Sequence, residues 1–401
     1  MRSVILGTFV PTILFELAMG AVMPIFVATA IDVGMSLKGA ALLVTMVAVG
    51  QLLSDVPAGA IAARLGDRAA MLIASGVGIA GFLAAYLATH PATLVVAILA
   101  MGGGSAAFFL ARQSYLTDIT HPLRRARVMS TMGGVVRIGL FFGPFCGAAI
   151  IPIFGVRAVY LLAVVTAAVG IIFILAFGST PTSHRSASQT KGPSYGQLLR
   201  DFRPQLATLG IAILLIGAVR GARMTVLPLW AEYLGLSPDT TSVIFGVANM
   251  IDMLLFYPAG KVMDAFGRLW IGIPAMIVMG AAFIVIPLTA TAWQLAAAAV
   301  LLGFGNGISS GILMTLGADI APQAGRSKFL GIWRIFSDTG SLAGPTILTI
   351  GAGLGSLAGG IWVMGGVGVL AVIAQWVWVP KWSEHANRTT RRRAGIKVTK
   401  L

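Results

Sequence analysis

Several ionisable side chains stand inside long stretches of sequence that are otherwise apolar. A carboxylate in apolar surroundings can take up and release a proton, and a buried guanidinium can hold an anion or a carboxylate. Such groups are costly to bury, so each is a candidate for function. They are Glu16, Asp55, Arg137, Arg220, Arg223, Asp252, Arg334 and Asp338.

The elements that must position these side chains are the apolar stretches themselves. The chain has 401 residues, of which 57% are hydrophobic and 10% are charged, whereas charged residues make up about 25% of a soluble protein. A helix needs about 20 mostly apolar residues to cross a bilayer. The sequence therefore predicts an all-α integral membrane protein with twelve transmembrane helices. These lie at residues 4–31, 39–63, 69–88, 93–117, 128–154, 157–179, 205–234, 239–263, 269–289, 293–317, 328–352 and 357–380.

The positive charges are distributed unevenly over the loops between these helices. If the N-terminus is cytoplasmic, nearly all loop Lys and Arg residues fall on the cytoplasmic side, as is typical of multi-pass membrane proteins. Both termini are therefore expected in the cytoplasm. The basic tail, with Arg391, Arg392 and Arg393, is expected to lie on anionic lipid head groups. The net charge of +15 is thus explained without nucleic-acid binding.

One stretch of the sequence occurs twice. PAGAIAARLGDR begins at Pro57, and PAGKVMDAFGR begins at Pro258, 201 positions later; the same offset relates Asp118 to Asp319 and Gly143 to Gly344. The repeat predicts two copies of a six-helix unit in one orientation, an arrangement found in transporters whose halves rock around a central site. The expected domains are an N-terminal six-helix bundle at 1–180, a flexible cytoplasmic linker at 181–204, a C-terminal six-helix bundle at 205–380 and a basic cytoplasmic tail at 381–401.

The loop after the second helix carries a recognisable pattern of glycine and charge. Its first copy has Gly59, Arg64, Gly66 and Arg68, and its second has Gly260, Asp264, Gly267 and Arg268. This pattern, the six-plus-six helices and the long central loop resemble the major facilitator superfamily over the whole chain. Two positions depart from the family pattern, because Ala63 replaces the usual acid and Asp67 stands where a basic residue is common.

Two structural expectations follow for this loop and for the fifth helix. Gly59 and Gly66 permit a close approach and a tight turn, and we expect the ion pairs Arg68 with Asp118 and Arg268 with Asp319. The run GLFFGPFCG resembles the family's antiporter motif. Its residues are Gly139, Gly143, Pro144 and Gly147. Close packing of helices explains this run as well as a coupling role does.

The resemblance implies that helices 5 and 8, and helices 2 and 11, face each other between the two halves. It then predicts a pair of Arg137 with Asp252 and a pair of Asp55 with Arg334. Asp338 would be reached by Gln51 or by Arg334, four residues before it. These pairs either hold the halves together or open when a carboxylate is protonated.

The resemblance also places helices 1 and 7 along a central cavity. Glu16 is then the first candidate for a carboxylate that binds a proton or the substrate, and its alternative role is a structural bridge to Arg220. With Arg223, the cavity would be basic, which favours an anionic or zwitterionic substrate. Arg112, near the end of the fourth helix, is expected to extend to water.

Enzyme motifs in the chain lack the context that they need. The run from Gly307 to Gly311 matches the G-x-S-x-G pattern, but it lies in a predicted membrane helix, and the histidines at 90, 121, 184 and 385 fall in loops or in the tail. No ATP-binding G-x-x-x-x-G-K-[ST] motif occurs. We therefore expect no catalytic residues, no metal and no cofactor, with a proton gradient as the energy source.

The sequence favours a secondary active transporter that works by alternating access and exports a small amphipathic compound in exchange for protons. The first alternative is a proton-coupled symporter for an organic anion or zwitterion, and the second is a membrane receptor or scaffold that transports nothing. The expected partners are a small-molecule substrate, protons and the lipid bilayer. We expect a monomer in a bacterial inner (plasma) membrane.

Overall fold

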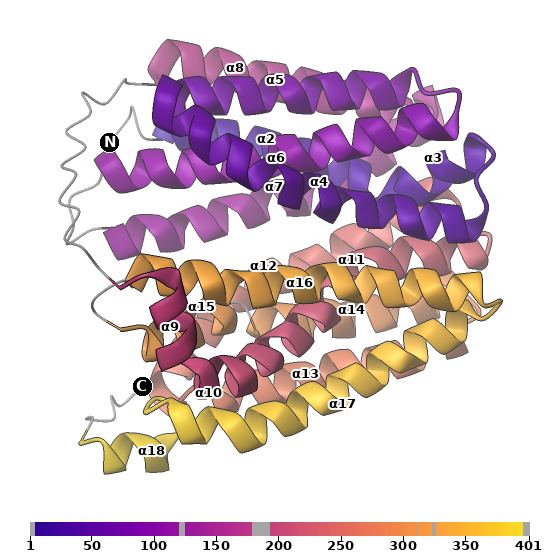
Figure 1. Ribbon diagram of the computed structural model, residues 1–401. Coiled ribbons are helices and arrows are strands. Elements are labelled where there is room, and N and C mark those ends of the chain that lie inside the picture. Colours follow the sequence, from indigo (N-terminus) through magenta and orange to yellow (C-terminus); the bar gives the residue numbers. More distant parts are fainter. Residues whose placement is uncertain (1–4, 120–124, 179–192, 310, 323–325, 396–401) are drawn as a thin grey trace. The chain divides into compact units, whose positions relative to one another are not determined.

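A computed structural model describes residues 5–119, 125–178, 193–309, 311–322 and 326–395 (Figure 1). Every regular element in these ranges is a helix. The predicted all-α fold is confirmed, and the predicted helix positions agree with the structure to within a few residues; the predicted helix 93–117, for example, is Pro91–Ile119.

The helices of the first half follow one another with short connections. They are η1 (Ile5–Phe9), α2 (Val10–Val22), η2 (Met23–Ile25), α3 (Phe26–Asp32), α4 (Leu37–Leu65), α5 (Asp67–Tyr86), α6 (Pro91–Ile119), α7 (Arg125–Phe154) and α8 (Ala158–Phe177). Helix α2 packs against α7 and α8, while α6 packs against α4 and α5. The candidate residue Glu16 therefore lies on a helix that packs against two others of its half.

The helices of the second half repeat this order with short additions. They are α9 (Tyr195–Asp201), α10 (Arg203–Gln205), η4 (Leu206–Gly210), α11 (Ile211–Tyr233), α12 (Pro238–Phe266), α13 (Leu269–Val285), η5 (Ile286–Leu288), α14 (Ala292–Ile308), α15 (Ile312–Ile320), α16 (Arg326–Gly353), α17 (Leu357–Trp382) and α18 (Arg388–Arg393). Helix α13 packs against α14 and α17, and α16 packs against α17.

Eleven helical segments within the described ranges are long and apolar enough to cross a membrane. The remaining predicted span is α16, which is long enough but more polar, since it carries Arg326, Lys328, Arg334 and Asp338. An internal helix of a membrane protein tolerates such residues when they face away from lipid. The fold is thus a multi-pass membrane fold of two six-helix repeats.

The chain divides into two compact units. Unit 1 comprises residues 1–184 and 227–249, and unit 2 comprises 185–226 and 250–401. The boundary therefore runs within α11 and α12. The division into bundles at a linker, inferred from the repeat, stays a prediction.

The repeat is visible in the glycine contacts of each half. In α7, a Cβ atom on Gly139 would lie 2.6 Å from the carbonyl oxygen of Ile13, and one on Gly143 would lie 2.5 Å from that of Leu17. In α16, Gly340 and Gly344 meet the carbonyl oxygens of Leu214 and Ala218 in the same way. All four contacts are related by the offset of 201 residues. Backbones can approach this closely only where a side chain is missing.

The segment expected to be a flexible linker is partly helical, so that expectation is wrong for its second part. Ser194 and Gln197 form a capping box that starts α9, and such a box satisfies amide groups that a helix otherwise leaves free. Leu198 of α9 is buried, and the ring of Phe202 packs edge-on against that of Phe329, with 5.0 Å between ring centres. Residues 179–192 lie outside the described part of the chain.

The tenth span is interrupted, which the hydropathy pattern does not reveal. Helix α14 ends at Ile308 and α15 begins at Ile312. Gly311 has a φ of +89°, a left-handed conformation that favours glycine. The equivalent stretch of α6 is continuous. An interrupted helix frees backbone carbonyls inside a membrane, where they need partners.

Candidate functional site

Unit 1 contains a buried ion pair between α2 and α6. Arg112 Nη1 lies 3.4 Å from Glu16 Oε1, and the two side chains are 1% and 14% exposed. The expectation that Arg112 extends to water is therefore wrong. The residue is turned inward because a carboxylate on the neighbouring helix compensates its charge, which a buried guanidinium requires.

Aromatic rings surround this pair. The guanidinium carbon of Arg112 lies 5.0 Å from the ring centre of Phe109 and 5.7 Å from that of Phe108. Phe108 stacks on Phe15, with 4.7 Å between ring centres. A guanidinium is attracted to the face of an aromatic ring. The site therefore combines one carboxylate, one guanidinium and an apolar wall.

The glycines of α7 hold α2 at this site. A Cβ atom on Gly139 would come within 2.6 Å of the Cβ of Glu16 itself. Gly147, the last glycine of the run, makes only an ordinary contact at 3.4 Å with Ala21, and Pro144 lies inside α7. The run thus serves close packing beside a candidate carboxylate, and its coupling role stays a prediction.

Unit 2 contains a different buried network. Asp252 of α12 accepts a 2.8 Å hydrogen bond from Asn306 Nδ2 of α14. Arg223 Nη2 of α11 lies 3.8 Å from the same carboxylate oxygen, and all three side chains are buried. Gly307 lies against the backbone of Asp252. Three helices therefore meet at one carboxylate.

The interrupted tenth span joins this network. Arg220 Nη1 of α11 donates to the carbonyl oxygen of Ser309 at 3.2 Å and lies 3.4 Å from its hydroxyl, which in turn donates to the Asn306 carbonyl. Ser309 is thus committed to structural hydrogen bonds rather than poised as a nucleophile. Sequence reasoning missed Asn306 and set Ser309 aside. Gly307 and Gly311, which flank Ser309, are the sequence signal that could have indicated a break in the helix here.

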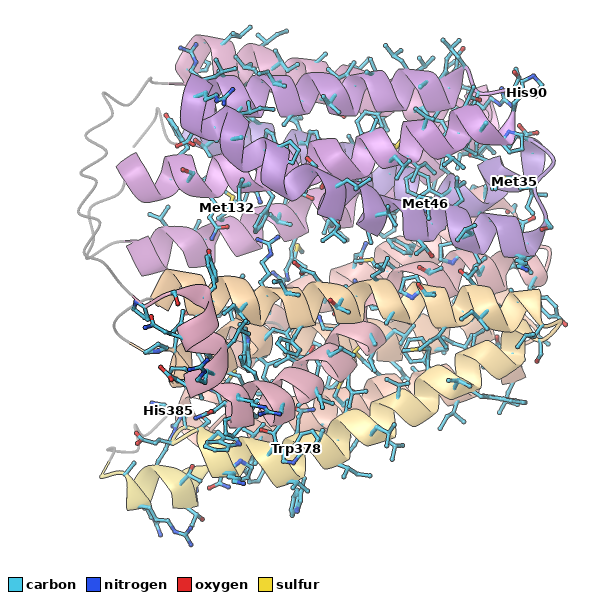
Figure 2. All side chains as sticks on the ribbon, in the orientation of Figure 1. Met35, Met46, His90, Met132, Trp378 and His385 are labelled. Carbon is cyan, nitrogen blue, oxygen red and sulfur yellow. The ribbon has the colours of Figure 1, made fainter. Side chains whose placement is uncertain are left out.

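The histidines that the sequence places in loops are found there where they are described. Figure 2 shows His90 at the junction of α5 and α6 and His385 beyond the end of α17. His121 and His184 lie outside the described residues.

One expected pair of helix 11 is confirmed. Arg334 Nε lies 3.1 Å from Asp338 Oδ2 along α16, so Arg334 is one partner of Asp338, as the sequence analysis offered.

Several other expected pairs remain without a structural test. Arg137 Nη1 donates to the carbonyl of Gly133 in its own helix. The side chain of Asp55 lies outside the described residues. The pairs of Arg137 with Asp252, Asp55 with Arg334 and Gln51 with Asp338 join residues of different units and stay predictions.

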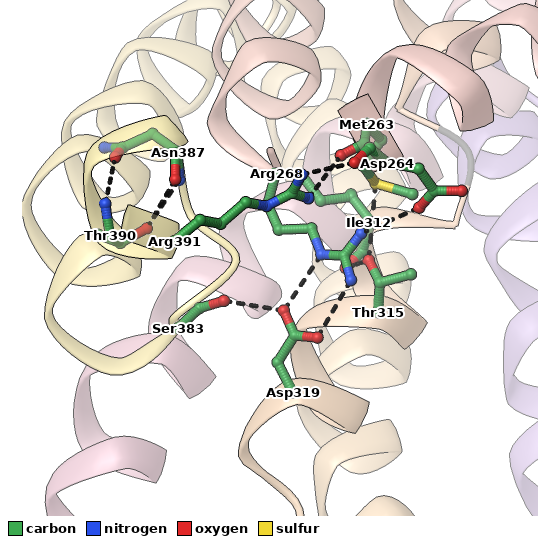
Figure 3. A network of polar contacts seen from close by, with 10 residues as sticks. All are labelled: Met263, Asp264, Arg268, Ile312, Thr315, Asp319, Ser383, Asn387, Thr390 and Arg391. Atoms are coloured by element: carbon green, nitrogen blue, oxygen red, sulfur yellow. Dashed lines mark hydrogen bonds and ion pairs between the residues drawn. The ribbon is translucent and has the colours of Figure 1, made fainter. Parts of the chain in front are cut away.

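The second copy of the loop signature forms the expected ion pair. Arg268 donates from Nε and Nη2 to the two oxygens of Asp319, both at 3.1 Å, and lies 3.6 Å from Asp264 (Figure 3). Ser383, at the end of α17, donates a 2.8 Å hydrogen bond to the same Asp319. Gly267 makes the turn with a φ of +109°.

The first copy of the loop is built differently. Arg68 donates to the carbonyl oxygen of Leu175 near the end of α8, at 2.7 Å. The side chain of Asp118, its expected partner, lies outside the described residues. Gly66 makes the expected turn, with a φ of +84°, and Arg64 is exposed. The expected close approach at Gly59 is wrong: among the described residues, a Cβ atom there would meet Leu110 alone, at 3.8 Å, and one on Gly260 would meet none within 4 Å.

A cavity is found among the helices of unit 1. It has a volume of about 260 Å³ and lies between α4, α5 and α6. Its walls include Gly50, Ser54, Ala74, Gly103 and Ala107, and they are mainly apolar. We assign no role in recognition to it.

The family of the chain follows from its whole length. A sequence model described as Major Facilitator Superfamily matches residues 8–219 and again residues 209–399. The chain belongs to the major facilitator superfamily. The double match agrees with the repeat seen in the glycine contacts, and the family consists of membrane transporters rather than enzymes.

Individual members of the superfamily are similar to this chain at different levels. Multidrug resistance protein MdtH of Klebsiella pneumoniae is 25% identical over 328 residues, covering 79% of each protein. A POT family transporter solved in complex with 5-aminolevulinic acid superimposes with a TM-score of 0.73 at 14% identity, over 95% of this chain and 96% of that one. A D-xylose-proton symporter gives 0.71 at 16% identity, over 94% and 97%. The two solved structures support the fold alone.

Proposed function

We propose that this transporter exports a small amphipathic compound in exchange for protons. The observation that carries the proposal is the buried pair of Glu16 and Arg112 beside aromatic rings in unit 1. The similarity to a multidrug resistance protein supports the export direction. The closely packed glycines of α7, which resemble an antiporter motif, support it as well.

The pair gives a simple basis for coupling. As long as Glu16 is ionised, it compensates the charge of Arg112, which is almost fully buried. Protonation of Glu16 removes that compensation, and an unpaired guanidinium in apolar surroundings is unfavourable. The protein can relieve this either by losing the proton or by changing conformation. Proton binding at Glu16 would therefore bias alternating access.

The aromatic wall suits the proposed substrate class. Phe15 and Phe108 present stacked rings next to the pair, and Phe109 is only partly buried. Binding sites for small molecules are mainly apolar with a few polar groups that orient the ligand. An amphipathic compound could place its apolar part on these rings and its polar part near Glu16.

Proteoliposomes that contain a pH-sensitive dye test the proposal. A panel of amphipathic compounds is added under an imposed pH gradient, and proton movement is recorded as the dye signal changes. We expect compound-dependent proton movement in the wild type and its loss in Glu16→Gln. Asp201→Asn removes an exposed carboxylate at the end of α9 and should behave like the wild type. If Glu16→Gln kept full coupling, the role given to Glu16 would be refuted.

A second candidate function is proton-coupled uptake of an organic anion or zwitterion. It is favoured by the network of unit 2, where Arg223 lies beside Asp252 and Arg220 donates to the carbonyl oxygen of Ser309. The two guanidiniums on neighbouring turns of α11 could attract an anionic group. The direction of proton movement separates the two candidates: protons enter with the substrate in uptake and move against it in export.

We further propose that the protein lies in a bacterial inner membrane as a monomer, with both termini in the cytoplasm. The distribution of Lys and Arg supports the orientation, and the bacterial relative supports the membrane. Fusions of a periplasm-active phosphatase to the C-terminus and to Gly155 test this. Activity at Gly155 alone is expected, and activity at the C-terminus would contradict the orientation.

A further inference from the structure

The corner between α12 and α13 is completed by the C-terminal tail. Helix α12 ends at Phe266 and α13 begins at Leu269. The first amides of a helix have no partner within it. Here the amide of Arg268 donates to the carbonyl of His385, and that of Leu269 donates to the carbonyl of Ala386, both at 3.0 Å. The tail therefore caps the start of α13.

The same tail caps the end of α12. Arg391 is only 4% exposed. Its guanidinium donates to the carbonyl oxygens of Met263 at 3.2 Å, Asp264 at 2.5 Å and Ala265 at 3.3 Å (Figure 3). These carbonyls belong to the last turn of the helix, where a positive charge is favourable. The expectation that Arg391 lies on lipid head groups is thus wrong, while its neighbours Arg392 and Arg393 are exposed.

Two further contacts tie the tail to its surroundings. Ser383 donates to Asp319, the carboxylate that also holds Arg268. The guanidinium carbon of Arg388 lies 4.5 Å from the ring centre of Phe266, at the end of α12. The cluster therefore connects the ends of α12, α13, α15 and α17.

We infer that residues 383–391 form a detachable clasp, whose docking keeps the α12–α13 corner and the ends of α15 and α17 together as one block. The clasp is held mainly by hydrogen bonds at the end of the unit, and water can replace such bonds. Its helix α18 has six residues, too few to be stable alone. Docking and release are therefore both accessible, which is the property that a regulatory contact needs.

Release would act on the helix that carries the network of unit 2. Without the tail, the amides of Arg268 and Leu269 and the carbonyls of Asp264 and Ala265 lose the partners described above, so the corner should fray. Asp252 lies on the same helix, fourteen residues before its end. The clasp is thus placed to influence the network of unit 2 from outside the membrane-spanning core. This inference does not depend on the substrate or on the direction of transport.

Hydrogen exchange on the full-length protein in lipid nanodiscs tests the clasp. In the wild type, peptides that cover the start of α13 and peptides that cover 383–391 should exchange at one shared rate, faster than the interior of α13. In Arg391→Ala, exchange at the start of α13 should rise at least tenfold. The equivalent corner at Asp67 and Arg68 should not change, because none of the described contacts of residues 383–391 reaches it.

The matched control is Arg392→Ala, which removes a neighbouring exposed arginine and should leave exchange at wild-type rates. Arg391→Lys should give an intermediate rate, since an ammonium group can reach fewer of the carbonyls. The inference is overturned if Arg391→Ala leaves the start of α13 protected, or if Arg391→Ala and Arg392→Ala raise its exchange equally. It is also overturned if exchange rises equally at the Asp67 corner, or if the wild-type tail exchanges as slowly as the interior of α13.

Discussion

The two halves share their packing contacts but not their charges. Gly139 and Gly143 lie against α2 just as Gly340 and Gly344 lie against α11, and Gly104 meets Ala74 just as Gly305 meets Ala275. The carboxylates of the two buried networks have no such counterparts. The position equivalent to Glu16 is Gly217, and that equivalent to Asp252 is Gln51. Duplication thus preserved the helix contacts, whereas the polar chemistry of each half became distinct.

The two loop copies show the same divergence at a finer scale. Asp67 and Arg268 occupy equivalent positions at the starts of α5 and α13. An acid is favourable at the start of a helix and an arginine is not. In the second copy, Asp319, Asp264 and the tail carbonyls compensate for the arginine. The charge reversal at this position therefore accompanies a set of compensating contacts in the second copy.

The largest expected effect is on the shared glycine contacts. Gly143→Leu and Gly344→Leu each place a side chain against the backbone of the facing helix. Overpacking of this kind costs about 3 kcal/mol or more when the backbone must move. Both variants should lose most of their folded protein, as measured by thermal unfolding in detergent. Gly134→Leu, with open space around its Cβ position, is the control; unequal losses at 143 and 344 would contradict equivalent packing.

The next largest losses of stability are expected when the two buried networks are broken, as measured by double-mutant cycles. Glu16→Leu should cost about 3 kcal/mol, because it leaves Arg112 without its carboxylate. Adding Arg112→Met should recover most of this loss, since both charges are then gone. The corresponding double variant of unit 2, Asp252→Leu with Arg223→Met, should remain about 1–3 kcal/mol less stable than the wild type. The reason is that the buried amide of Asn306 loses its acceptor. Equal recovery in both units would show that the networks are not distinct.

The fold could be predicted from the sequence because its signals are local or repeated. Spans of about 20 apolar residues define the helices, and one constant offset of 201 residues relates the halves. The pair of Arg268 with Asp319 could also be predicted. Arg268 belongs to the second loop signature, and Asp319 lies at the end of a neighbouring predicted helix. The span that corresponds to α16 was predicted at 328–352 with the others, and the offset of 201 residues gives it the place of α7 in the second half.

The buried networks could not be predicted in the same way. Glu16 and Arg112 are separated by 96 residues, and nothing in their local sequence says that α2 and α6 bring them together. Asn306 is uncharged and therefore drew no attention in a search for ionisable groups. Arg391 stands among three consecutive arginines, and only the position of α18 shows which of them is buried. Tertiary contacts decide all three cases.

The two loop copies should respond differently to loss of their arginines. Arg268→Gln removes two charged hydrogen bonds to Asp319 in a largely buried setting and should lower stability by about 1.5–3 kcal/mol. Arg68→Gln removes one described hydrogen bond to a backbone carbonyl and should cost about 1 kcal/mol. The two are compared by their melting temperatures in one detergent. If Arg68→Gln lowered the melting temperature more than Arg268→Gln, the loop of unit 2 would not be the more strongly held of the two.

The smallest expected effect comes from an exposed ion pair of unit 1. Arg157 Nη2 lies 2.8 Å from Asp32 Oδ2, a shorter distance than those of the Arg268 pair, but the side chains are 38% and 61% exposed. Water screens exposed pairs, which contribute about 0–1 kcal/mol. Asp32→Asn should therefore lower the melting temperature only slightly, and less so as salt is raised. Asp319→Asn should keep its larger effect at high salt, because burial limits screening. If the exposed pair proved as costly to break as the buried one, burial would not be what separates the pair at Asp32 from the pair at Asp319.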